Sequence, residues 1–77
     1  MENLSYKIIL RKEKEGYTVL VPSLPGCITC GDTVEEAIEM AKEAISLYLD
    51  DLLAHSEKIP TDQDLQEYTV QLENQYV

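Results

Sequence analysis

Every second residue is apolar over a short stretch near the N-terminus. In residues 4–11 these positions are Leu4, Tyr6, Ile8 and Leu10. A period of two predicts a β-strand with one buried face. The charged residues 12–16 end in Gly16, which can adopt a positive φ, and residues 17–21 return at once to β-forming side chains. The pattern predicts a β-hairpin.

Prolines and a glycine separate this hairpin from a third strand. Residues 22–26 hold two prolines, which cannot donate to a β-ladder, and a glycine that suits a turn. Residues 27–30 (CITC) are then predicted as a short strand, which Gly31 closes.

The period then changes to three and four residues. The apolar positions are Val34, Ala37, Ile38, Ala41, Ala44, Ile45, Tyr48, Leu49, Leu52 and Leu53. This spacing predicts an amphipathic helix of about five turns. Asp32 or Thr33 is the expected N-cap, and Thr33 and Glu36 have the spacing of a capping box. We expect the helix to fray near His55.

Alternation returns near the C-terminus, from Glu67 onward. Tyr68, Val70 and Leu72 share one side, and Thr69, Gln71 and Glu73 share the other. This predicts a fourth strand, and the order β-β-β-α-β predicts an α+β fold. A right-handed crossover would place the last strand beside the first and parallel to it, in a four-stranded mixed sheet with the helix packed on one face.

A single helix covers only one face of such a sheet. The other face, which includes Ile9 and Leu20, then needs solvent-tolerant cover or a second subunit. We therefore expect a homo-oligomer, a dimer or a tetramer.

Length and charge limit the number of domains and the kinds of partner that are possible. A chain of 77 residues allows one domain, residues 1–77. The formal net charge is −9, and the acidic residues lie mainly after residue 31. Such a charge repels nucleic acid phosphates and suits a basic partner protein. The alternative is an acidic face that only keeps a small protein soluble.

The sequence also indicates where in the cell the protein is located. No apolar run reaches the ~20 residues of a membrane helix, and residues 1–3 (MEN) lack the features of a signal peptide. Two cysteines do not make a disulfide framework. We expect a cytoplasmic protein that does not bind membranes.

Candidate reactive residues are few. Cys27 and Cys30 lie in extended chain and point to opposite faces, so we interpret them as structural, with a metal or redox role as the alternative. His55, the only histidine, is interpreted as a helix cap. The acids of the helix project outward and do not converge. We expect no catalytic residue, no metal and no cofactor.

Three motifs together resemble a known family. They are V-P-S-L-P-G-C at residues 21–27, G-D-T-V-E-E-A at residues 31–37 and A-K-E-A-I at residues 41–45. This combination is similar to the HicB family, the antitoxin halves of HicA/HicB toxin-antitoxin pairs. The resemblance covers residues 6 to about 60.

The resemblance implies a partial ribonuclease-H-like fold and a HicA-like toxin partner, a small basic protein that cuts mRNA and is held inactive. A ribonuclease-H site would need an acid in the middle of the first strand, where this chain has Lys7, Ile8 and Ile9. We therefore expect a binding domain and not an enzyme. Many HicB-like proteins add a C-terminal DNA-binding module. Since this chain ends right after the predicted fourth strand, we expect no direct DNA binding.

The candidate partner-binding residues come from three places. The helix offers Glu35, Glu36, Glu39 and Glu43 for steering, the turn offers Leu24 and Pro25, and the last strand offers Thr69, Gln71 and Glu73. Three functions remain open: neutralisation of a toxin, a stand-alone oligomeric HicB-like domain with a regulatory role and no toxin, and an unusual hydrolase.

Overall fold

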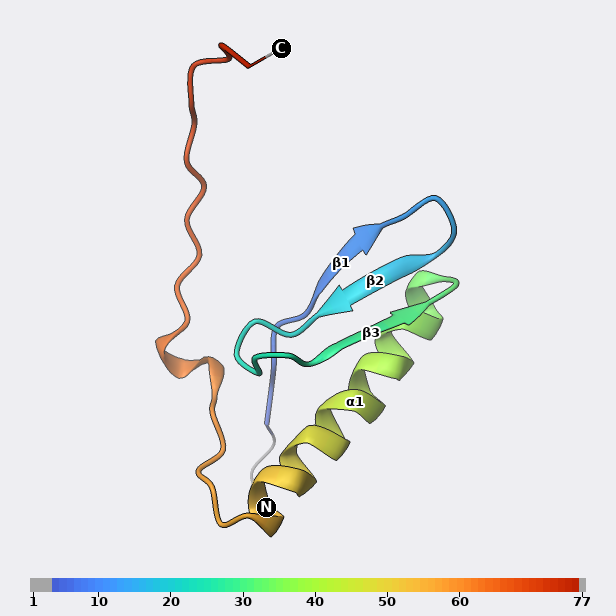
Figure 1. The fold of residues 1–77 in the computed structure, drawn as a ribbon, viewed down its shortest axis with the longest axis vertical. Helices are drawn as coiled ribbons and strands as arrows, with labels where there is room; N and C mark the ends of the chain where they lie inside the picture. The colour runs from blue at the N-terminus through green and yellow to red at the C-terminus, as the bar shows by residue number, and fades with distance from the viewer. Residues whose placement is uncertain (1–3, 77) are drawn as a thin grey trace.

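A three-stranded sheet and one long helix make up the body of the molecule. The computed structural model describes residues 4–76; residues 1–3, on which the expectation of no signal peptide rests, and Val77 lie outside the described residues. The elements are β1 (Ile9–Lys12), β2 (Tyr17–Leu20), β3 (Ile28–Gly31), α1 (Val34–Ala54) and the short 3-10 helix η1 (Asp62–Asp64). The strands are antiparallel in the order β1-β2-β3 (Figure 1). The predicted hairpin, third strand and helix are confirmed.

The strand register separates the two faces of the sheet. Val19 lies opposite Leu10 on β1 and opposite Thr29 on β3, and this row faces α1. Val19 is fully buried in one cluster with Ala37 and Ala41 of the helix. The small side chains at these two helix positions allow α1 to lie close to the sheet.

The neighbouring row of side chains points away from α1. It contains Ile9, Leu20 and Ile28, which lie opposite one another across the strands, and we call it the open face. Ile9 is 47% exposed and Ile28 is 60% exposed. Leu20, between them, is half-buried. The prediction that one helix leaves apolar side chains uncovered on the other face is therefore confirmed for Ile9 and only in part for Leu20.

The turn between β2 and β3 folds back into the core. The Leu24 N–H donates to the Val21 carbonyl (3.0 Å), and the Cys27 N–H donates to the Leu24 carbonyl (2.9 Å). Val21, Leu24 and Cys27 form a second buried cluster, against which Tyr6 and Tyr48 pack. The turn is therefore part of the core.

Both predicted caps of α1 are present. Thr33 is the N-cap, and its hydroxyl accepts from the Glu36 N–H at 3.0 Å. The Glu36 carboxylate in turn accepts from the Asp32 N–H at 3.3 Å. His55 is the C-cap. No helix among residues 4–76 combines the length and the apolar character needed to cross a membrane.

The predicted fourth strand is not formed. Residues 65–76, which we call the tail, contain no strand, and their side chains from Gln66 onward are exposed. Figure 1 shows the tail (orange to red) running away from the sheet to the C-terminus. A period of two fixes which side chains share a face, but a strand also needs a neighbouring edge. The sheet is therefore three-stranded and antiparallel, not the four-stranded mixed sheet that the order of elements predicted.

Candidate functional site

An acidic helix face occupies the first half of α1. Glu35, Glu36, Glu39 and Glu43 are all exposed. Glu35, Glu39 and Glu43 follow at four-residue steps, so like charges are neighbours on the helix surface. Lys42 offsets part of this repulsion, because its ammonium lies 3.3 Å from the Glu39 carboxylate. That pair is largely exposed and adds little stability, so it does not prevent Glu39 from meeting a basic surface.

Part of this acidic face also has a structural role. Glu35 and Glu36 lie in the first turn of α1, where negative charge is favourable to the helix dipole. Glu36 also closes the cap through the Asp32 N–H. Of the four acids, Glu39 and Glu43 are therefore the better candidates for a purely external role.

Apolar side chains continue the acidic face toward the C-terminal half of the helix. One stripe on α1 combines acidic and apolar side chains at steps of four and three residues. It consists of Glu36, Met40, Glu43 and Leu47. Leu47 is 64% exposed. It lines a groove of ≈ 350 Å³ together with Ile28 and Tyr48, which we call the β3 groove. Sequence reasoning did not select Leu47 or Ile28, since a single exposed apolar residue carries no signal without its neighbours.

The two candidate residues of the turn differ in exposure. Leu24 is fully buried and holds the turn in the core, so its side chain offers no surface to a partner. Pro25 is exposed, and its carbonyl accepts from the Tyr48 hydroxyl at 2.8 Å. Because Tyr48 also lines the β3 groove, the structure brings Pro25 next to that groove.

The candidate residues Thr69, Gln71 and Glu73 lie elsewhere. All are exposed on the tail. The tail leaves the body beside the residues that precede β1, whereas α1 packs chiefly against β3 at the other edge of the sheet. The structure therefore does not join the tail residues to the acidic helix face.

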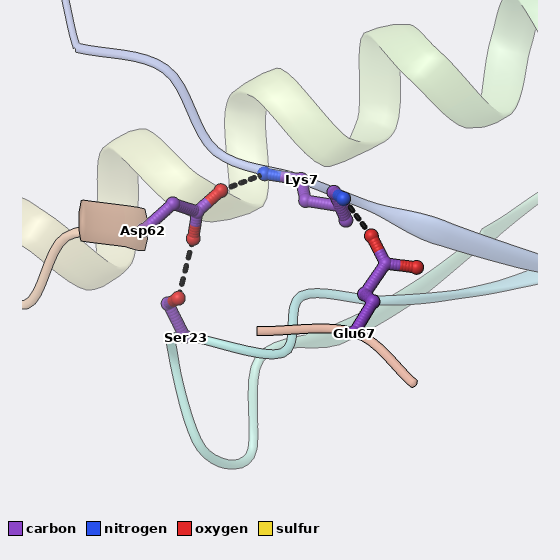
Figure 2. Close-up of polar contacts among 4 residues, drawn as sticks. All are labelled: Lys7, Ser23, Asp62 and Glu67. Atoms are coloured by element: carbon purple, nitrogen blue, oxygen red, sulfur yellow. Dashed lines mark hydrogen bonds and ion pairs between the residues drawn. The ribbon is translucent and has the colours of Figure 1, made fainter. Parts of the chain in front are cut away.

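A polar cluster ties the chain after α1 to the sheet. Figure 2 shows the Asp62 carboxylate between the Lys7 backbone N–H, which donates to it at 2.5 Å, and the Ser23 hydroxyl, which also donates to it. Glu67 forms an ion pair with the Lys7 ammonium. Each of these contacts joins segments that are distant in sequence, so we interpret the cluster as a tether.

The same tether includes Tyr6. Its hydroxyl donates to the Pro60 carbonyl at 2.5 Å. Burial, and then the nearby charge of Asp62, raise the pKa of Tyr6. The hydroxyl therefore keeps its proton and remains a donor.

The cysteines and the histidine are placed as the sequence predicted. Cys27 is buried, Cys30 is exposed, and both are free thiols. Burial raises the pKa of the Cys27 thiol, which makes it less reactive. His55 Nδ1 lies 2.8 Å from the Asp51 carbonyl at the end of α1. Within the part of the chain that the structure describes, no group of three or more His, Cys, Asp or Glu could hold a metal ion.

Fold and surface together define a small acidic α+β domain with one covering helix. The family model described as "HicB_like antitoxin of bacterial toxin-antitoxin system" matches residues 6–77. The chain therefore belongs to the HicB-like antitoxin family. This membership supports an antitoxin role.

Individual relatives agree with that assignment. The chain is 47% identical over 68 residues to a UPF0150 protein of Thermoplasma acidophilum, a match that covers 87% of this chain and 97% of that protein. It is 39% identical over 61 residues to Antitoxin HicB 1 of Photorhabdus laumondii and 33% identical over 60 residues to Antitoxin HicB 2 of the same organism. Each of these matches covers 78% of this chain, but only 39% and 43% of the antitoxins. The chain thus spans less than half the length of the relatives that are named antitoxins.

Proposed function

We propose that this protein binds a small basic HicA-type toxin that cuts mRNA and holds it inactive by direct contact. The observation that carries the proposal is the exposed acidic helix face, which continues into an apolar groove, in a member of an antitoxin family. Protein interfaces commonly combine an apolar centre with a charged rim. The β3 groove supplies the apolar centre and the glutamates supply the rim.

Charge and apolar contact would have separate effects in this complex. Glu39 and Glu43 would steer a cationic toxin toward α1 and speed association at low salt. Leu47, Ile28 and Pro25 would then slow dissociation by burying apolar surface. The toxin works on mRNA, so we place the complex in the cytoplasm. Since the net charge of −9 repels DNA, we propose that any effect on transcription requires a basic partner.

The test compares two charge-reversed variants. Glu39→Lys with Glu43→Lys reverses the acidic helix face, and Glu57→Lys with Asp64→Lys makes the same change in net charge at exposed positions after α1. Binding to a small basic toxin encoded next to this protein is measured by calorimetry at low and physiological salt. We expect the first variant to bind about tenfold or more weakly, a change of about 1.4 kcal/mol, and the second to bind nearly as the natural chain does.

Three results would contradict the proposal. Equal losses in both variants would show that only net charge matters. The proposal of direct binding would be refuted if the natural chain formed no complex with such a toxin at low salt. Normal mRNA cleavage by a toxin that is fully bound would refute neutralisation.

A second candidate is a stand-alone oligomeric HicB-like domain with a regulatory role and no toxin. The apolar open face around Ile9 and Ile28 favours it, because this surface needs cover even when no toxin is present. A stable homo-oligomer from a gene without a toxin-like neighbour would favour this function over the first.

A further inference from the structure

The tail carries an exposed apolar face. Tyr68, Val70 and Leu72 are 83%, 81% and 76% exposed. Since these residues are two apart in extended chain, their side chains share one side. Three large apolar side chains in a row, all in water, are costly for a small protein and indicate a surface that is covered in its assembled state.

An apolar groove that could receive these side chains opens beside β1. It has a volume of ≈ 440 Å³ and is lined mainly by apolar side chains, among them Tyr6 and Ile8 from the chain leading into β1 and Ile38, Ile45 and Leu49 from α1. We call it the β1 groove. Its lining residues come from this first segment and from α1, so it opens on the β1 side of the sheet.

The edge of β1 next to this groove has free backbone groups. β1 is an outer strand and, among residues 4–76, pairs only with β2. At the hairpin the Glu13 N–H donates to the Gly16 carbonyl at 3.0 Å. Because backbone N–H groups alternate in direction along a strand, those of Leu10 and Lys12 point away from β2, toward the open edge. That edge can accept another strand.

The tail of the same chain starts from the wrong face to fill this groove. Asp62 is held by the Lys7 N–H and the Ser23 hydroxyl, and Glu67 is held by the Lys7 ammonium (Figure 2). The Lys7 side chain shares the open face with Ile9, two residues on, whereas the β1 groove lies on the α1 side. From this tether the tail runs away from its own body (Figure 1).

We propose that two copies of this chain exchange tails. Residues 68–76 of each copy add as a strand to the β1 edge of the other copy and place Tyr68, Val70 and Leu72 in its β1 groove. The lengths agree, because residues 68–76 and residues 4–12 each span about 30 Å at ~3.3 Å per residue. Exchange of an identical element is a common route to dimers.

Charge also favours this pairing. Arg11 lies on β1 with its side chain on the open face, and Glu73 would lie on the same side of the exchanged strand. Cross-strand pairs of opposite charge stabilise a sheet. Thr69 and Gln71 lie on the same side of the exchanged strand as Glu73, and they stay available to a further partner. The inference goes beyond the proposed function, because the dimer needs no toxin.

The experiment measures the oligomeric state of the full chain by sedimentation equilibrium. Val70→Asp with Leu72→Asp charges the apolar face of the tail, and Thr69→Asp with Gln71→Asp makes the same charge change on its polar face. We expect a dimer for the natural chain and for the polar-face variant. The apolar-face variant should dissociate at least 100-fold more readily.

A mixing experiment tests the exchange itself. Ile38→Glu places a charge in the β1 groove. Because Ile38 is 38% exposed, this variant should keep the fold. The Ile38→Glu variant alone should also be a monomer. Mixed with the apolar-face variant, it should form a heterodimer, because its intact tail meets the intact groove of the other copy. A monomeric natural chain, a dimer that survives Val70→Asp with Leu72→Asp, or a mixture without heterodimer would each overturn the proposal. Since no toxin is present, these results are independent of toxin binding.

Discussion

His55 closes α1 with its ring as well as its backbone. A carbonyl oxygen can only accept, so Nδ1, 2.8 Å from the Asp51 carbonyl, carries the hydrogen. This hydrogen bond, followed by the charge of Asp51, raises the pKa of His55. The imidazolium also supplies the positive charge that the last turn of α1 otherwise lacks.

We expect the pKa of His55 in the folded protein to lie above about 6.5, its usual value. Because folding raises this pKa, the contribution of His55 to stability is complete below about pH 6.5 and is lost as pH rises through the folded value. An NMR titration of the ring checks the pKa. Asp51→Asn should lower it only in part, since the backbone hydrogen bond remains. A folded-state pKa at or below 6.5 would contradict this account.

Single residues differ in how far the sequence predicts them. Thr33 and His55 are predictable as caps because a cap depends on residues within one helical turn. Leu24 is not, because its burial depends on Tyr6 and Tyr48, which are distant in sequence. For the same reason, the sequence could nominate Pro25 as a contact residue but could not show that Leu24 is unavailable.

The contact between β3 and α1 depends on the absence of a side chain at Gly31. A Cβ at this position would lie 2.5 Å from the Ala37 nitrogen and 2.7 Å from its Cα. Both atoms belong to the helix backbone, which cannot move without shifting the whole element. This close approach positions the first turn of α1 and therefore the acidic helix face.

Gly31→Ala should accordingly destabilise the protein by about 3 kcal/mol, at the upper end of typical overpacking costs. Gly26→Ala is the matched control, because a Cβ there meets nothing within 4 Å and the cost comes only from φ of +81°. That strain should cost about 1 kcal/mol. Urea unfolding followed by circular dichroism measures both. A smaller loss for Gly31→Ala than for Gly26→Ala would disprove the role of the close approach.

At the level of elements, local periodicity was sufficient for the hairpin, β3 and α1. It failed for the tail, where Tyr68, Val70 and Leu72 alternate as in a strand but no strand edge in the described part of the chain pairs with them. Pairing is a non-local property, and for this segment the proposed partner edge lies in another copy. The β3 groove was missed for a related reason, since Ile28 and Leu47 meet only after folding.

The molecule as a whole carries much negative charge for its size. A net charge of −9 is spread over a body whose extents are 48 × 29 × 22 Å. At an ionic strength of about 0.01 M the Debye length is about 30 Å, so most of these charges repel one another. The sequence predicts this repulsion well, because it depends on composition more than on detailed structure.

Raising the ionic strength from about 0.01 M to about 0.15 M shortens the Debye length to about 8 Å. We expect the melting temperature to rise by about 4 °C, which corresponds to about 1 kcal/mol for a domain of this size. Scanning calorimetry at a fixed protein concentration measures it. Glu57→Gln with Asp64→Asn, which removes two exposed charges, should show a smaller rise. A melting temperature that falls with salt would mean that attractive pairs outweigh the repulsion.

The opposite orientation of the two cysteines allows one of them to be labelled selectively. The Cys27 thiol is buried and the Cys30 thiol is exposed, on the same face of the sheet as Ile28. A maleimide dye should therefore attach at Cys30 alone, without mutagenesis. Its emission would then report directly when that side of the molecule is shielded from solvent.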